Sequence, residues 1–225
     1  DIINETKLRK ALNIIHDGLF EIRALKKRLK RTLSGYFRDV DTAVNALMSN
    51  NINLQGFNVY MTLNAITPEC YDRSQKDRMT IPEVTTNDDV IIGYKWLFID
   101  LDPVRPADLS STDAQIDKAK AKARKILAYL KRIGFEDPVV AMSGNGIHLL
   151  YRIALANNAD NEDLIQRCLQ ALSLMFSDDD VKVDTANFNP ARICKLYGTL
   201  AQKGSGTEER PHRMSYIIKA PDVIN

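Results

Sequence analysis

The sequence predicts a mixed α+β fold in which helices cover a sheet and the chain forms two lobes. Segments with the two-residue period of strands alternate with segments that have the longer period of amphipathic helices. Apolar segments flank a Gly-rich turn at 143–146, and a hairpin there would make the sheet mixed. We therefore expect one domain over 1–225, with an N-terminal α/β lobe at about 1–90 and a second lobe at about 91–225.

The N-terminal lobe combines both periodicities. Ser34 and Gly35 predict a turn that leads into a short helix, for which Asp39 or Asp41 would supply the N-terminal cap. The other expected elements are a helix that ends near Gly18, strands over 19–25 and 57–63, and a polar surface segment over 68–87.

The second lobe contains the clearest helix of the chain. Thr112 and Gln115 have the spacing of a capping box, and apolar residues recur on one helical face until Gly134. The other expected elements are a buried strand that ends at Pro103, two strands around 143–146, a helix from Asp160, and strands over 181–184 and 216–219.

Composition limits the class of protein. With 44% hydrophobic and 27% charged residues, the chain resembles ordinary soluble proteins, and no apolar run approaches the ~20 residues of a membrane helix. Three widely spaced cysteines form neither a zinc ribbon nor a disulfide framework, which favours a reducing, cytoplasmic setting without a membrane partner. The chain starts at Asp1 rather than Met, which suggests a domain of a longer protein.

A run of basic residues without acids lies between Arg23 and Arg38, and Tyr36 and Phe37 sit beside it. Basic side chains next to aromatic rings suit a phosphate backbone with stacked bases, although such a run also fits a solvated surface. The residues predicted to bind nucleic acid are Lys26, Lys27, Arg28, Lys30, Arg31 and Arg38.

Asp100 and Asp102 end the buried strand and carry the main chemical signal. Alternate residues of a strand share a face, so the two carboxylates stand side by side, roughly 6.6 Å apart at Cα. Ionised carboxylates at the end of a buried strand are costly unless cations or donors compensate them. Such a pair can gather divalent cations, which in Mg²⁺ sites commonly also hold substrate phosphates.

The turn Ser143–Gly144–Asn145–Gly146 precedes His148. Its glycines allow the backbone to approach a ligand closely, and consecutive N–H groups there can bind an anion. His148 could donate to a phosphate oxygen, but a plain hairpin followed by a packed histidine explains the same pattern.

Asp184 offers a third carboxylate at the end of the short strand 181–184. The preceding acidic run 178–180 competes for this role, but we interpret it as a solvated loop. Basic residues suited to phosphate contact follow, and these are Arg192, Lys195, Lys203, Arg210 and Arg213.

The order of these segments and their residues resemble the archaeo-eukaryotic primase (AEP) superfamily, and most closely primase-polymerases of plasmids, phages and CRISPR-associated systems. The resemblance runs from about Gly35 to Ser215. Its most specific parts are Phe98–Pro103, Ser143–His148, Asp184 with Asn189–Arg192, and Gly198–Thr199; shorter similar parts are 35–37, 62–64 and 210–213.

The resemblance implies a catalytic lobe like an RNA-recognition motif and template-dependent DNA primase and polymerase activity with dNTP or NTP substrates. It implies two Mg²⁺ or Mn²⁺ ions on Asp100, Asp102 and Asp184, and no zinc. The nucleotide would contact Ser143, Gly144, Asn145, His148, Arg192, Lys195, Lys203 and Arg213, with Tyr36 and Asn64 near the base or sugar. Single-stranded or primed DNA would be the template, and helicase or CRISPR-associated domains could lie outside this chain.

Two other classes of function stay open. A replication-initiator module could keep the fold and bind nucleic acid without catalysis. An Asp-x-Asp glycosyltransferase or a two-metal nuclease could use the acidic pair, although a glycosyltransferase does not need the turn with His148. A nicking nuclease would want paired metal-binding histidines, and His16, His148 and His212 are far apart in sequence.

Overall fold

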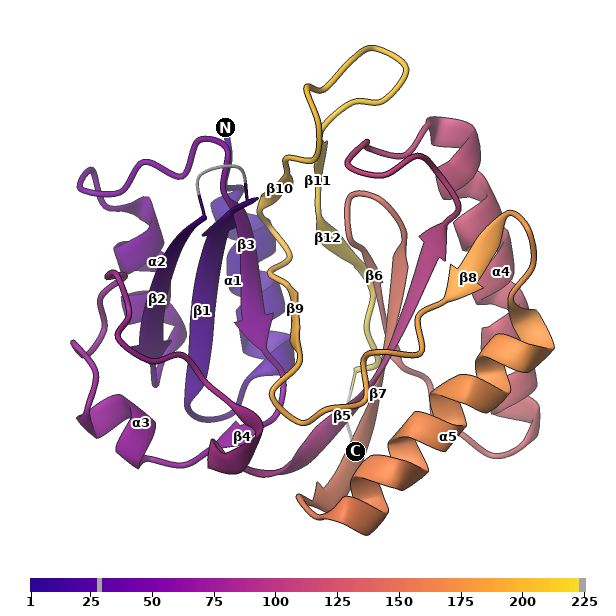
Figure 1. The fold of residues 1–225 in the computed structure, drawn as a ribbon, viewed down its shortest axis with the longest axis horizontal. Helices are drawn as coiled ribbons and strands as arrows, with labels where there is room; N and C mark the ends of the chain where they lie inside the picture. The colour runs from indigo at the N-terminus through magenta and orange to yellow at the C-terminus, as the bar shows by residue number, and fades with distance from the viewer. Residues whose placement is uncertain (28–29, 223–225) are drawn as a thin grey trace.

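The computed structural model describes residues 1–27 and 30–222, and it confirms the mixed α+β fold (Figure 1). Its elements are α1 (Glu5–Ile15), β1 (Phe20–Lys26), β2 (Arg31–Phe37), α2 (Val40–Met48), β3 (Asn58–Thr62), β4 (Ala65–Ile66), α3 (Glu69–Asp72), a 3₁₀ turn (Asp88–Val90), β5 (Ile91–Pro103), α4 (Asp113–Arg132), β6 (Val139–Met142), β7 (Ile147–Ala156), α5 (Ala159–Phe176), β8 (Val181–Val183), β9 (Ile193–Lys195), β10 (Leu200–Ala201), β11 (Arg213–Met214) and β12 (Tyr216–Lys219). None of the helices in these described ranges is long and apolar enough to cross a membrane.

In the described residues, most strands belong to two antiparallel sheets. The N-terminal sheet has the order β2-β1-β3-β9. The second sheet has the order β12-β6-β7-β5-β4, and β8 also pairs with β5. Each sheet takes a strand from the other half of the chain, since β9 joins the N-terminal sheet and β4 joins the second sheet. In Figure 1, β9 accordingly runs down the middle of the molecule.

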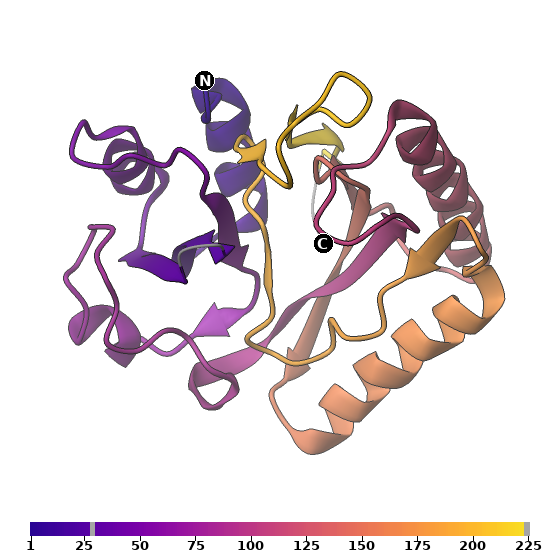
Figure 2. The same cartoon turned by 45° about the horizontal axis from the view of Figure 1, so that its top comes forward.

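Helices α4 and α5 cover the outer face of the second sheet, whereas α1 packs between the other face of that sheet and the N-terminal sheet. Figures 1 and 2 show α1 against the N-terminal sheet, and α4 and α5 on the outside of the second sheet. Along β5, Ile99 and Leu101 pack with α4 and α5, whereas Phe98 packs with the core beneath α1. Because strand residues alternate, Asp100 and Asp102 continue the Phe98 face and therefore look toward the junction of the two halves.

Local signals in the sequence place the helix starts correctly. Thr112 and Gln115 form the predicted capping box at α4, with both reciprocal hydrogen bonds present. At α2 the cap is Asp39, whose side chain accepts from the backbone N–H of Thr42 at 2.9 Å. The strand predicted from the apolar run before the acids is also present, as the 13-residue β5.

The turn predicted at Ser34 and Gly35 is wrong, because both residues lie in the middle of β2. Ser34 donates a short hydrogen bond of 2.5 Å to the buried carboxylate of Glu21 on β1. Gly35 lies under a crossing segment, and a Cβ there would meet the carbonyl oxygen of Arg78 at 2.6 Å. These small residues therefore make room for a neighbour, rather than allowing the chain to turn.

Candidate active site

Asp100, His148 and Asp184 lie in one row across the second sheet. Antiparallel pairing sets Asp100 on β5 opposite His148 on β7. On the other side of β5, the N–H of Asp184 donates to the carbonyl of Asp100 at 3.0 Å, directly after the β5–β8 ladder. Opposed residues of antiparallel strands share a face, and Asp102 lies on that face two residues farther along β5. The backbone thus brings the three predicted carboxylates and the predicted histidine together.

Each carboxylate uses one oxygen and keeps the other open. Oδ1 of Asp102 accepts from Arg105 at 2.6 Å, and Oδ1 of Asp184 accepts a backbone N–H two residues on at 2.8 Å. Oδ1 of Asp100 lies 3.4 Å from Nε2 of His148. No group in the described part of the chain donates a hydrogen bond to the three Oδ2 atoms. Open carboxylate oxygens on one face are the ligands that Mg²⁺ and Mn²⁺ prefer.

The electrostatics of the acidic pair also fit a cation. Burial and the neighbouring charge of Asp100 raise the pKa of Asp102, while Arg105 and Lys203 act in the opposite direction. Like charges this close favour a bound cation between them. No three His, Cys, Asp or Glu side chains within 1–27 and 30–222 already gather as a preformed metal site. The fit of metal ions therefore rests on the shared face, the open oxygens and the raised pKa.

His148 is buried and engaged at both ring nitrogens. Nδ1 lies 2.8 Å from the hydroxyl of Tyr197, and Nε2 faces Asp100. The ring packs edge-on against Phe98, with centroids 4.8 Å apart. Burial lowers the pKa of His148, but the charges and hydrogen bonds of Asp100 and Cys194 outweigh it and raise the pKa to about 10. A positive imidazolium beside the carboxylates would favour an anionic substrate there.

The turn at 143–146 is a tight, packed structure. Oγ of Ser143 accepts from the N–H of Gly146 at 3.0 Å, and the side chain of Asn145 accepts from the N–H of Ser111 before α4. Gly144 has a positive φ of 99°, and a Cβ there would lie 2.3 Å from Cβ of Ala201. The turn therefore packs closely against β10. Nucleotide contacts by Ser143, Gly144 and Asn145 remain a prediction.

The predicted phosphate-binding cations lie at different depths. Arg192 is fixed by the loop before it, with 2.8 Å to Oδ1 of Asn189 and 2.6 Å to the carbonyl of Ala186. Arg213 bonds to the residues that begin α4, including an ion pair of 2.7 Å with Asp113. Lys203 is partly exposed, and its charge lowers the pKa of Asp102.

Lys195 is the most deeply placed of these cations. It lies opposite Tyr60 in the β3–β9 pair, and its Nζ donates to the carbonyl of Leu200 at 3.1 Å. The side chain is buried, and burial lowers the pKa of Lys195 to about 7. The amine is therefore only partly charged at neutral pH, and an anion nearby would favour the charged form.

Tyr36 and Asn64 both have structural contacts. Tyr36 is 3% exposed, and its hydroxyl bonds to Thr86 at 2.9 Å. The amide of Asn64 donates to the carbonyl of Pro190 at 2.9 Å and accepts from the N–H of Lys95 at 2.8 Å. Its carbonyl therefore satisfies the backbone where β5 has a bulge. A role near base or sugar remains a prediction for both residues, and it would add to these contacts.

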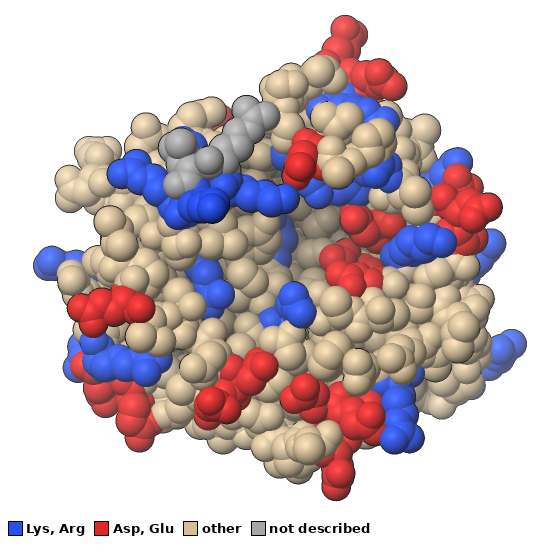
Figure 3. All heavy atoms as spheres, in the orientation of Figure 1, with Lys and Arg blue, Asp and Glu red and all other residues tan. Residues whose placement is uncertain are grey.

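Most described residues of the predicted basic run are exposed. Figure 3 shows Lys and Arg in a band beside the hollow at the middle of this face, with Asp and Glu on its other side. Lys30, Arg31 and Arg38 are exposed, and Lys26 lies over the ring of Phe57, 5.5 Å from its centroid. Lys27 reaches across to Asp108 at 3.1 Å, from the N-terminal sheet to the loop after β5. The predicted residue Arg28 lies outside the described residues.

Two residues near the carboxylates escaped the sequence reasoning. Arg105 pairs with Asp102, and its position two residues after Pro103 could have suggested this contact. Tyr197 contacts His148 from a segment 49 residues away in the chain, and no local pattern signals that contact.

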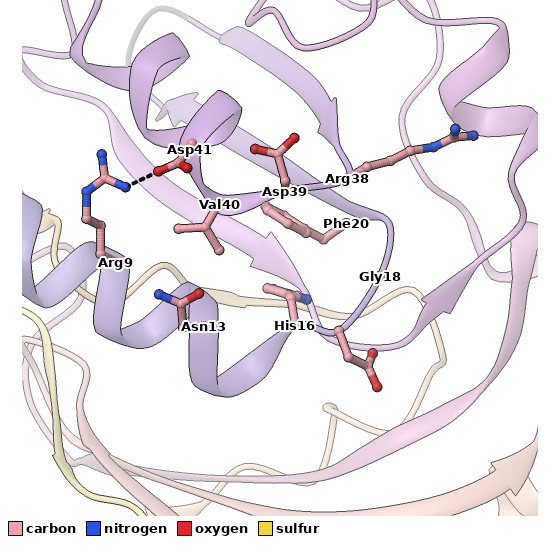
Figure 4. Close-up of a pocket in the computed structure, with 10 residues that line it drawn as sticks. Arg9, Asn13, His16, Gly18, Phe20, Arg38, Asp39, Val40 and Asp41 are labelled. Atoms are coloured by element: carbon pink, nitrogen blue, oxygen red, sulfur yellow. Dashed lines mark hydrogen bonds and ion pairs between the residues drawn. The ribbon is translucent and has the colours of Figure 1, made fainter.

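A separate pocket of about 480 Å³ lies between the end of α1 and the start of α2 (Figure 4). Arg9, Asn13 and Arg38 are among its lining residues. His16, at the end of α1, stacks on Phe20 with centroids 4.3 Å apart, and burial lowers the pKa of His16 to about 3. The carboxylate row is not part of this pocket.

Comparison with known proteins rests on structure. No protein-family model matches the chain, and no curated protein matches it in sequence. Among solved structures, the primase RepB′ is similar, with a TM-score of 0.50 and 12% identity over 96% of this chain. The chain spans 56% of the length of that primase chain.

Two further solved structures are similar at lower TM-scores. The catalytic domain of RepB′ in complex with initiator DNA has a TM-score of 0.48 and 12% identity, over 95% of this chain and 85% of that one. The polymerase domain of Mycobacterium tuberculosis ligase D in complex with DNA has a TM-score of 0.46 and 13% identity, over 93% and 79%. The likeness to RepB′ confirms the predicted mixed α+β fold, which this chain shares with that primase.

Proposed function

We propose that this chain is the catalytic domain of a primase-polymerase that adds nucleotides to a primer on a single-stranded DNA template. The row of Asp100, His148 and Asp184, with Asp102 on the same face, carries the proposal. The fold shared with the primase RepB′ supports it. Phosphoryl and nucleotidyl transfer depend mainly on positioning and charge neutralisation, and the groups around this row are suited to both.

Asp100, Asp102 and Asp184 would hold two Mg²⁺ or Mn²⁺ ions through their open Oδ2 atoms. Ions held there would neutralise charge on the triphosphate and would lower the pKa of the attacking 3′-hydroxyl. His148 would donate to a phosphate oxygen beside Asp100, because its pKa is raised and it carries a proton. Lys203 would add positive charge near Asp102, where its field already lowers the pKa of that carboxyl.

The exposed basic residues would hold the template strand. Lys30 and Arg31 are exposed, and Arg31 begins β2. Phosphate contacts from such residues bind single strands without reading their sequence. The template would then run from these residues toward the carboxylate row.

Primer extension by matched variants tests the proposal. We expect Asp100→Asn to abolish incorporation of both dNTPs and NTPs in Mg²⁺ and in Mn²⁺, while circular dichroism shows a folded chain. The control is Asp179→Asn, which removes an exposed carboxylate from the acidic run before β8 and should keep full activity. Normal activity of Asp100→Asn would refute the metal assignment.

The same assay separates a binding module from an enzyme. If the wild-type chain binds primed template but incorporates no labelled nucleotide in either metal, the chain is a non-catalytic nucleic-acid-binding module. If Asp100→Asn and Asp179→Asn both lose activity, the acidic run at 178–180 also contributes to the metal site. Products sized without a primer would show whether synthesis starts de novo.

A further inference from the structure

Tyr197 makes a contact that the proposed chemistry leaves unexplained. It is fully buried, at 0% exposure, and follows β9 of the N-terminal sheet. The neighbouring N–H of Leu196 donates to the carbonyl of Val59 on β3 at 2.9 Å, which fixes the segment to that sheet. Its hydroxyl nevertheless reaches Nδ1 of His148 on the second sheet, at 2.8 Å.

The hydroxyl of Tyr197 lies among buried side chains. Sγ of Cys194 lies 3.2 Å from the Tyr197 hydroxyl and 3.6 Å from Nδ1 of His148. The rings of Tyr197 and His148 meet edge-on, with centroids 5.8 Å apart, and Phe98 also packs edge-on against the imidazole. A buried hydroxyl needs partners, and here they are the Cys194 thiol and, at the shorter distance of 2.8 Å, the ring whose Nε2 faces Asp100.

We propose that Tyr197 is a positioning residue, which holds the imidazole of His148 so that Nε2 points at the Asp100 carboxylate and the phosphates beside it. The proposal rests on the proposed function for the identity of the substrate only. A histidine is oriented by the hydrogen bond that its second nitrogen makes. Without the hydroxyl, the ring would keep its packing but lose this anchor.

The position of Tyr197 also gives the anchor a wider consequence. Tyr197 follows directly after β9 of the N-terminal sheet, whereas His148 and Asp100 belong to the second sheet. The aim of His148 therefore depends on the relative placement of the two sheets. A merely space-filling tyrosine would need its ring only, and phenylalanine would replace it without effect on the histidine.

Tyr197→Phe tests the proposal, with Tyr151→Phe as the matched control. Tyr151 is also buried, at 4% exposure, lies on the same strand as His148, and has an edge-on ring contact with Phe135. We expect kcat for nucleotide addition to fall about 3- to 10-fold in Tyr197→Phe, as for the loss of one hydrogen bond. The dissociation constant for template DNA should stay within twofold of wild type, because the hydroxyl does not face solvent.

The decisive readout is the side-chain ¹⁵N spectrum of histidine, which needs no activity. The chain has 3 histidines, so His148 can be assigned with a His148→Gln variant. We expect the Nδ1 and Nε2 signals of His148 to move in Tyr197→Phe and to stay in place in Tyr151→Phe. An unmoved His148 spectrum together with wild-type kcat would overturn the proposal.

Two outcomes separate this proposal from the proposed function. An inactive wild-type chain in which the His148 signals still move upon Tyr197→Phe would refute nucleotidyl transfer but support the anchor. If Tyr197→Phe does not fold, a nuclear Overhauser spectrum of the wild-type protein tests the hydrogen bond between Tyr197 and His148 directly. A nuclear Overhauser contact between the Tyr197 hydroxyl proton and the His148 ring supports the proposal, and its absence overturns it.

Discussion

Gly146 lies against the backbone of β5 beside Asp100 and Asp102. Adding one methyl group at this position should lower both stability and activity. A Cβ at Gly146 would lie 2.2 Å from the carbonyl oxygen of Leu101, the residue between Asp100 and Asp102. Contacts shorter than 3.0 Å are essentially never seen for Cβ atoms, so β5 and β7 must separate locally by 0.8 Å or more, the difference between the two distances.

Forced overpacking of this kind costs about 1–3 kcal/mol of unfolding free energy. A shift near 1 Å in a positioned catalytic group can reduce the rate by about 10²-fold. We therefore expect Gly146→Ala to lower stability by about 1–3 kcal/mol in urea unfolding and to lower kcat for primer extension by about 10- to 100-fold.

Gly18→Ala is the control, because no atom lies within 4 Å of a Cβ at Gly18 and its φ is not positive. It should be neutral or slightly stabilising, and kcat should not change. Should Gly146→Ala match Gly18→Ala in both measurements, the close approach of the turn to Leu101 does not hold the carboxylates in place.

Three further predictions concern the surroundings of the site. Burial lowers the pKa of Lys195 to about 7, so the unfolded chain binds more protons between pH 7 and 10. As the pH rises from 7 to 9, the free energy of unfolding of wild type should therefore increase by about 2 kcal/mol relative to that of Lys195→Met. A difference that stays constant over this pH range in urea titrations would contradict the lowered pKa. Asn64→Ala leaves the carbonyl of Pro190 and the N–H of Lys95 without their partner. It should lower the free energy of unfolding by about 2–4 kcal/mol in the same urea assay. A loss below about 0.5 kcal/mol would show that water replaces the amide. Replacing Lys30 and Arg31 together by Ala should reduce the salt dependence of single-strand binding by about 1.4 in log–log slope, with kcat unchanged at saturating template; an unchanged slope would place the strand elsewhere.

Much of the site could be predicted because its signals are local. The capping box of Thr112 and the alternation that ends in Asp100 and Asp102 depend on neighbours within a few residues. These patterns fix which residues share a face, and the sequence order supplies Asp184 as the third carboxylate.

The remaining contacts depend on tertiary pairing. Position 35 requires a glycine because the backbone of Arg78 passes close to it, and Arg78 is far from Gly35 in the sequence. The pairing of Asp100 with both His148 and Asp184 is a matter of strand register, which no single segment determines. Tyr197 follows β9, which pairs with β3, and it contacts His148 from 49 residues away, so its role is invisible in the local sequence.

The exchange of strands between the two halves also dictates how this chain can fold during synthesis. Until the residues of β9 have been made, the β3 edge of the N-terminal sheet has no partner, although β1, β2 and β3 are already available. An unpaired strand edge is a template for pairing with other chains. Contacts of such long sequence separation also slow folding. On the ribosome, the N-terminal half therefore passes through a stage in which its edge must be protected, and we expect truncation before β9 to yield aggregates rather than a folded lobe.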